Sequence, residues 1–409
     1  MRALLAIAAT LLIANVAIAV AQRPDAFTAS RENAAIAYNT TPVNTIVEEV
    51  NRKLDAGTLK FTFDPTSGYL RSALEAFALP VESQLLVYTG TSLQAPKINM
   101  QNPRAVYFTD TLAMAWVRTG VVLEVEAQDP RQGSIYYTLD QSTAGTPHFS
   151  RQLSCLSCHL SWDTLAVPGP IILSTFPRKT DKDYANGFAV DHYRDLRERW
   201  GGWYVTGRKA PIHHLGNLPL FMPKGTDDSS PPPLKATVEG RFDLNGYPTP
   251  YSDVVALMVI EHQSHAANLI TRLGWEARVG HADRVPDAIR DLVDYLFFVD
   301  EAKIPERIEG SSGYAEKFQA LGPKDSQGRS LREFELNGRM MRYPLSYMIY
   351  SPAIDALPDE VKAALFRKLD QVLKGEDTSA KFAHLTPAIR QAIVEILRDT
   401  KPGVVTPAA

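Results

Sequence analysis

Cysteine is scarce in this sequence of 409 residues, which contains only two. A chain of this length can bury enough apolar surface to fold without disulfide bonds, so a disulfide scaffold is excluded. Charge of one sign is also lacking, since 43 Lys and Arg against 46 Asp and Glu give a formal net charge of −3. Without a basic excess to hold a phosphate backbone, no nucleic-acid partner is expected.

Long hydrophobic runs are absent after the first 21 residues. The almost wholly apolar run from Ala3 to Ala17 follows the positively charged Arg2 and precedes Ala19-Val20-Ala21, a small-x-small cleavage pattern. Residues 1–21 are therefore predicted to be a secretory signal peptide, with an uncleaved N-terminal anchor as the alternative. We expect a periplasmic protein with no membrane span after signal cleavage.

The two cysteines stand close together in Cys155-Leu156-Ser157-Cys158-His159. This C-x-x-C-H spacing is typical of covalent haem c attachment, in which each thiol adds to a haem vinyl group and the adjacent imidazole binds the iron. A thioredoxin-type redox disulfide is one alternative, but no βαβ pattern surrounds the motif and it leaves the fused histidine without a role. A structural zinc site would need further ligands. We predict one covalent haem c on Cys155 and Cys158, with His159 as the proximal iron ligand.

Around this motif the sequence resembles the c-type cytochromes. In many of them a Gly-Pro-x-Leu-like segment follows the ligand histidine, and its proline carbonyl accepts a hydrogen bond from the imidazole. Gly169-Pro170-Ile171-Ile172 occupies that place here, so the resemblance implies that Pro170 orients His159. An ordinary loop proline is the alternative. The whole chain is similar to large exported mono-haem cytochrome c domain proteins and, more loosely, to di-haem peroxidases and exported haem c oxygenases.

Hydrophobic patterns divide the chain into two regions. Between residues 85 and 141, short β-branched and aromatic segments alternate with turn residues and predict strands, with Thr119-Gly120 in a hairpin turn. After the haem motif, apolar residues recur at helical spacing, most clearly from an N-cap at Ser252 to Leu273. The predicted fold class is therefore α+β.

The expected organisation has a β-containing N-terminal region followed by a mostly helical, cytochrome c-like region that carries the haem. The expected parts are the signal peptide (1–21), the N-terminal region (22–141), the haem region (142–400) with an exposed loop at about 223–234, and a disordered tail (401–409).

The sixth iron position decides the function, because a protein ligand there favours electron transfer, whereas an open position can bind and activate a small molecule. The predicted distal ligands are Met222, His214, His262 and His265, with His213, Met340 and Met341 as weaker choices. Each has an ordinary alternative as an apolar anchor or a satisfied imidazole. A separate zinc or non-haem iron site around His262 is a further alternative.

We expect one-electron transfer in a periplasmic redox chain, with a redox partner protein. The alternative is a haem-dependent oxidoreductase of peroxidase or oxygenase type, with an open distal site and a small-molecule substrate. The length of the chain favours this alternative, because an electron carrier needs only a small fold while a substrate pocket needs walls. A haem-based sensor or binding subunit is a third class.

Overall fold

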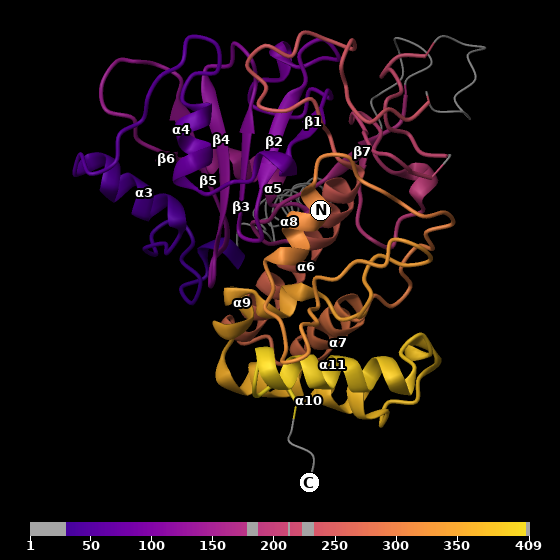
Figure 1. The fold of residues 1–409 in the computed structure, drawn as a ribbon. Coiled ribbons are helices and arrows are strands. Elements are labelled where there is room, and N and C mark those ends of the chain that lie inside the picture. Colours follow the sequence, from indigo (N-terminus) through magenta and orange to yellow (C-terminus); the bar gives the residue numbers. More distant parts are fainter. Residues whose placement is uncertain (1–29, 178–186, 212, 223–232, 406–409) are drawn as a thin grey trace, which may run out of the picture.

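The computed structural model describes residues 30–177, 187–211, 213–222 and 233–405. The fold class is α+β, as predicted, with an antiparallel sheet of six strands in the N-terminal half and helices in the C-terminal half (Figure 1). The predicted signal peptide (1–21) and residues 223–232 of the expected loop lie outside the described residues.

Each strand of the sheet pairs with the strand that precedes it in the chain. The strands are β1 (Leu85–Val87), β2 (Arg104–Phe108), β3 (Leu112–Trp116), β4 (Val122–Asp129), β5 (Gly133–Asp140) and β6 (Ser150–Arg151). The predicted turn at Thr119-Gly120 joins β3 to β4, which pair antiparallel. Because β6 lies beyond residue 141, the expected division between the two regions runs through the sheet.

Helices pack on both faces of this sheet, and further helices follow at the C-terminal end of the molecule. They are α3 (Ile46–Asp55), α4 (Leu70–Ala76), α5 (Leu156–His159), α6 (Val254–Arg278), α7 (Val285–Leu296), α8 (Tyr314–Ala320), α9 (Pro352–Asp355), α10 (Asp359–Lys374) and α11 (Pro387–Thr400). A separate two-stranded sheet consists of β7 (Leu173–Thr175) and β8 (Gly187–Ala189). Within the described ranges, no helix combines the length and apolarity needed to cross a bilayer.

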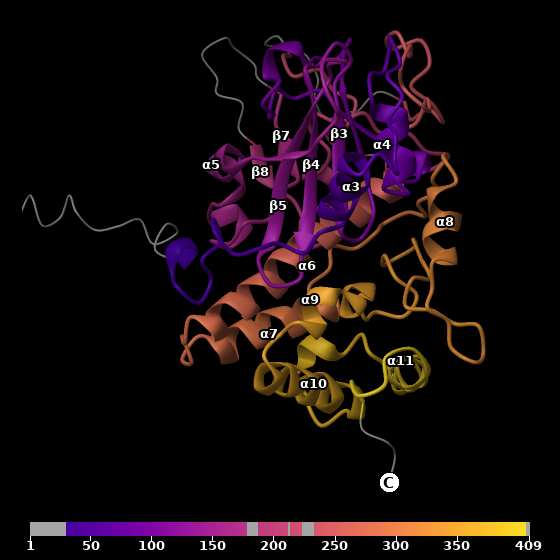
Figure 2. The ribbon, with the colours of Figure 1, turned by 90° about the vertical axis from the view of Figure 1, so that its left-hand side faces the viewer.

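Alternating side chains give the six-stranded sheet two different faces. On one face, large residues such as Met114 and Trp116 share a core with α3 and α4. On the other face, Val106 and Phe108 share a core with α6. Figures 1 and 2 show the sheet between these two layers, with α10 and α11 at the end of the molecule where the chain finishes.

Helix α6 corresponds to the helix predicted from Ser252 to Leu273, but both of its ends differ. Asp253, not Ser252, caps the helix, because its carboxylate accepts hydrogen bonds from backbone N–H groups of the first turn. Gly274 does not end the helix, because the next residue, Trp275, is buried and continues the apolar surface. Tertiary packing therefore overrides the local preference of glycine for a helix end.

Residues 401–405, the described part of the predicted tail, are more ordered than predicted. Thr386 caps α11, since its hydroxyl accepts a hydrogen bond from the backbone N–H of Ile389. Beyond α11, however, Val404 and Val405 are only 2% and 6% exposed and join the main core. The prediction of a disordered tail is therefore wrong for residues 401–405, because these two side chains have an apolar surface to cover.

Candidate functional site

The C-x-x-C-H motif opens onto a cavity of about 470 Å³, which we call the motif cavity. Cys155, Cys158 and His159 all line it. The motif follows β6 closely and forms the short helix α5, with Cys155 at its N-cap and Cys158 and His159 inside it, so the sheet edge brings both thiols to the cavity. Neither cysteine forms a disulfide, and Cys158 is exposed. The residues predicted to hold the haem thus share one hollow.

Strands β2, β3, β4 and β5 all contribute to the wall of the motif cavity. Strand β3 contributes Ala113 and Ala115, whose small side chains leave the space open, while Met114 between them points to the opposite face. Helix α6 closes another side with Ile260 and Ser264. Strands therefore line more of this cavity than helices do, which differs from the mainly helical surroundings expected for the haem.

The imidazole of His159 is held from two directions. Its Nδ1 lies 3.0 Å from the carbonyl oxygen of Gly169, and its ring packs against that of Tyr136 with 4.6 Å between centroids. The Tyr136 hydroxyl donates to the same carbonyl oxygen at 2.7 Å. Burial lowers the pKa of His159, so the ring is neutral and Nδ1 carries the donated hydrogen. Nε2 has no hydrogen-bond partner among the described residues and is free to bind iron, so these residues fit a haem.

The prediction that Pro170 orients His159 is wrong by one residue. The carbonyl of Gly169 takes that role, and the Gly169 N–H also donates to the His159 carbonyl at 3.0 Å. The Pro170 carbonyl instead accepts a hydrogen bond from Nδ2 of Asn268 at 2.9 Å, while Pro170 itself lines the motif cavity. Asn268 on α6 thus anchors the loop that orients His159, and no spacing in the sequence marks it.

Gly169→Ala is expected to destabilise this loop. An added Cβ would lie 1.8 Å from Oδ1 of Asn268, which is 2% exposed and has little room to move. Losing the bond from Asn268 to Pro170 should lower the free energy of unfolding by about 1–2 kcal/mol, measured by urea denaturation.

Gly274→Ala is the matched control, because its added Cβ meets only an ordinary contact at 3.4 Å and lies in a helix that alanine favours. It should be neutral or stabilising. Equal stability of both variants would contradict the assigned close approach of Asn268 to Gly169.

None of the predicted distal ligands lines the motif cavity, and neither do His213, Met340 or Met341. His262 is fully buried, with Nδ1 at 2.8 Å from Nδ1 of His192 and Nε2 at 2.7 Å from the Ser346 hydroxyl. It stands two residues from Ile260 and Ser264, which turns its side chain about 200° away from theirs around the helix. His262 is therefore the satisfied imidazole of the alternative interpretation.

The other three predicted ligands have equally local surroundings. Nδ1 of His265 lies 3.7 Å from Asp191, and Nδ1 of His214 accepts a backbone N–H at 3.0 Å while its ring packs edge-on against Trp200. Met222 is buried away from the motif cavity. In the part of the chain that the structure describes, no three His, Cys, Asp or Glu side chains are grouped to hold a metal ion, so the alternative of a zinc site finds no support.

One wall of the motif cavity carries ionisable groups that the sequence analysis did not identify. Nη1 of Arg104 lies 3.1 Å from Oε2 of Glu124, and both side chains are mostly buried. Glu126, on the same face of β4, accepts hydrogen bonds from Ser134 and Gln128, each at 2.7 Å. Burial raises the pKa of Glu126 to about 7. Near neutral pH this wall can therefore both donate and accept protons.

Comparison with known proteins does not assign this chain to a family. No protein family model, no curated protein and no solved structure matched the chain. A function for this chain therefore has to be inferred from the C-x-x-C-H motif and from the walls of the motif cavity.

Proposed function

We propose that this chain is an exported haem c protein that acts as a haem-dependent oxidoreductase with an open distal site. Cys155 and Cys158 would hold the haem covalently and His159 would bind its iron in the motif cavity. Export to the periplasm is part of the proposal and depends on residues 1–21. The cofactor would supply one-electron redox chemistry and an iron site for a small ligand.

The composition of the cavity lining carries this proposal. The sequence has nine histidines and eight methionines, and all of them except Met1 fall within the described residues. Of these, His159 alone lines the motif cavity. No histidine or methionine is therefore placed opposite His159, and the sixth iron position would be open to a small molecule.

The ionisable wall supports an enzymatic role for such an open position. The Arg104 guanidinium can donate hydrogen bonds to a small oxygen-containing ligand, while its ion pair with Glu124 keeps it in place. Glu126 has a pKa of about 7, which suits it to exchange protons in both directions near neutral pH. A redox partner protein would supply the electrons.

Simple electron transfer, which the sequence led us to expect, receives less support from this geometry. The electron-transfer hypothesis needs Met222, His214, His262 or His265 as the sixth iron ligand. None of these four residues lines the motif cavity, and the three histidines contact other described residues.

The wild-type holoprotein is expected to bind carbon monoxide when reduced and cyanide when oxidised, without any mutation. An open iron position gives a high-spin spectrum and rapid, complete ligand binding, both visible as shifts of the Soret band. His262→Ala and Met222→Ala serve as matched controls and should leave these shifts unchanged. A low-spin wild type that becomes high spin in one of these variants would restore the electron-carrier hypothesis.

A further inference from the structure

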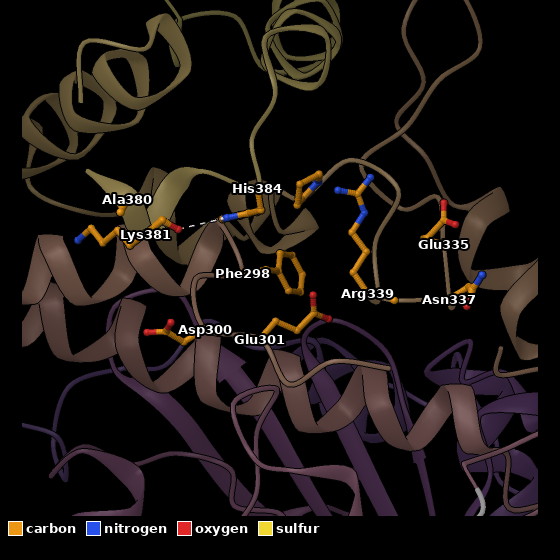
Figure 3. Close-up of a pocket in the computed structure, with 11 residues that line it drawn as sticks. Phe298, Asp300, Glu301, Glu335, Asn337, Arg339, Ala380, Lys381 and His384 are labelled. Atoms are coloured by element: carbon orange, nitrogen blue, oxygen red, sulfur yellow. Dashed lines mark hydrogen bonds between the residues drawn. The ribbon is translucent and has the colours of Figure 1, made fainter. Parts of the chain in front are cut away.

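The cavity shown in Figure 3, of about 700 Å³, has a histidine in its lining, as the motif cavity does. This residue, His384, has a carbonyl oxygen close to each ring nitrogen, that of Lys381 at 3.2 Å from Nδ1 and that of Phe297 at 2.7 Å from Nε2. Among the described residues, His159 has a hydrogen-bond partner only at Nδ1. Its basicity as an iron ligand therefore depends on the hydrogen bond at Nδ1.

The hydrogen bond from His159 ends on a carbonyl oxygen that has a second donor. The Gly169 carbonyl oxygen lies 3.0 Å from Nδ1 of His159 and 2.7 Å from the hydroxyl of Tyr136. A carbonyl oxygen can only accept, so both groups donate to it, and both distances are those of ordinary hydrogen bonds. Each donor polarises the same oxygen toward itself, so each bond is weaker than it would be alone.

The hydroxyl of Tyr136 is held at this carbonyl by the sheet and by ring packing. Tyr136 lies in β5, which pairs with β4 on one side and with β6 on the other. The residue is 5% exposed, and its ring packs against that of His159 with 4.6 Å between centroids. Strand pairing and burial therefore leave the hydroxyl little freedom to reach another acceptor.

The loop that carries the shared carbonyl is also fixed independently of this hydroxyl. Three successive carbonyl groups, those of residues 168–170, accept hydrogen bonds from different parts of the chain. The backbone N–H of Ser134 donates to the first at 3.0 Å, the Tyr136 hydroxyl to the second at 2.7 Å and Nδ2 of Asn268 to the third at 2.9 Å. Because two of these bonds do not involve Tyr136, the loop is expected to keep its position without the hydroxyl.

The strength of the bond from Nδ1 affects the redox behaviour of an iron bound at Nε2. A stronger bond to the Gly169 carbonyl makes the imidazole of His159 a more basic ligand. A more basic ligand favours oxidised over reduced iron and lowers the reduction potential. By sharing the carbonyl, the Tyr136 hydroxyl has the opposite effect.

We propose that Tyr136 is a positioning residue that raises the reduction potential of the site by sharing the Gly169 carbonyl with His159. A higher potential eases the transfer of electrons from a redox partner. The inference rests on the proposed function in one respect, the haem bound at His159. It does not depend on whether the distal site is open.

Tyr136→Phe tests this inference, because it keeps the ring against His159 and removes only the hydroxyl. The midpoint potential of the holoprotein, measured by spectroelectrochemical titration, should fall. At the midpoint potential of the wild type, the ratio of oxidised to reduced haem should rise by about threefold to tenfold, the factor expected for one hydrogen bond. In the reduced protein the iron–histidine stretching frequency, measured by resonance Raman spectroscopy, should rise because a more basic imidazole binds iron more strongly.

Tyr88→Phe is the matched control. It removes the hydroxyl of another buried tyrosine, which donates to the backbone carbonyl of Leu218 at 2.6 Å and does not line the motif cavity. This variant should keep the potential and the stretching frequency of the wild type.

Two results would overturn the role of Tyr136. One is an unchanged potential in the Tyr136 variant. The other is a lower potential with an unchanged iron–histidine frequency, since the polarity of the cavity would then be the cause. Failure of carbon monoxide binding contradicts only the open distal site and leaves the potential measurable. A wild-type chain without haem overturns the proposed function itself, and haem extraction shows that outcome separately.

Discussion

Replacing Cys155 and Cys158 with alanine is expected to abolish covalent haem attachment completely. Both thiols line the cavity that His159 faces, and each would form one thioether to the haem. After extraction with acidified acetone, the wild-type polypeptide should retain haem in a pyridine haemochrome assay and by intact mass, whereas the double variant should retain none.

Ser157→Ala is the matched control for this experiment, because it changes the exposed residue between the two cysteines and leaves both thiols in place. This variant should retain haem like the wild type. A wild-type chain that releases all its haem on extraction would contradict covalent attachment, and with it the central part of the proposed function.

Arg199→Ala is expected to cause a large loss of stability, greater than that of Gly169→Ala. Nη1 of Arg199 lies 3.1 Å from Oε2 of Glu261, and the two side chains are 3% and 1% exposed. Arg199 also donates hydrogen bonds to the carbonyls of Arg194 and His192. Removing it leaves a buried carboxylate without a countercharge, which should lower the free energy of unfolding by about 3–5 kcal/mol in urea denaturation.

The pH dependence of this loss follows from Glu261. Burial raises the pKa of Glu261 to about 7, although the neighbouring Arg199 lowers it. Without Arg199 the carboxyl group is easier to accommodate in its neutral form, which predominates at lower pH. Because the folded-state pKa lies above the unfolded value, the variant should lose further stability as pH rises. The deficit relative to wild type is therefore expected to be smaller at pH 5 than at pH 8.

Two further variants distinguish the buried pair from an ordinary ion pair. Arg197→Ala removes an arginine that is 73% exposed and pairs with Asp195, and it should cost less than about 1 kcal/mol. The double variant Arg199→Ala, Glu261→Gln should recover part of the stability, because no buried charge is left unpaired. Equal losses of unfolding free energy in the Arg197 and Arg199 variants would show that burial of the Arg199–Glu261 pair does not affect stability.

The fold class could be predicted because local patterns and tertiary structure agree along most of the chain. Strands such as β4 alternate in burial from residue to residue, and this alternation is visible in the sequence. Helix ends were less predictable. Gly274 is typical of a residue at a helix end, but the helix continues to Arg278 because the buried Trp275 packs against the core. Such tertiary packing cannot be predicted from the neighbouring residues in the sequence.

The candidate site could be predicted only where its residues are close in sequence. Cys155, Cys158 and His159 form a motif whose chemistry is independent of the fold. Arg104 and Glu126 line the same cavity only because strand pairing places them there. From the sequence alone, charged residues in strands are expected to face solvent, so neither is marked as part of the site. His262 was predicted as a possible iron ligand because it is a histidine on a helix face. Only the structure shows that both of its ring nitrogens already lie within hydrogen-bond distance of a partner, Nδ1 of His192 and the Ser346 hydroxyl.

The order in which the walls of the motif cavity are synthesised has a consequence for loading the proposed haem. All six strands precede α6 by about a hundred residues or more, and each strand pairs with its predecessor, so the sheet can assemble on a chain whose later part has not emerged. At that stage Cys155, Cys158 and His159 follow the sheet directly, while the side later closed by Ile260 and Ser264 is open. A flat, rigid cofactor could then enter sideways across the sheet. Folding of α6 would afterwards enclose it and, through Asn268, secure the loop behind His159.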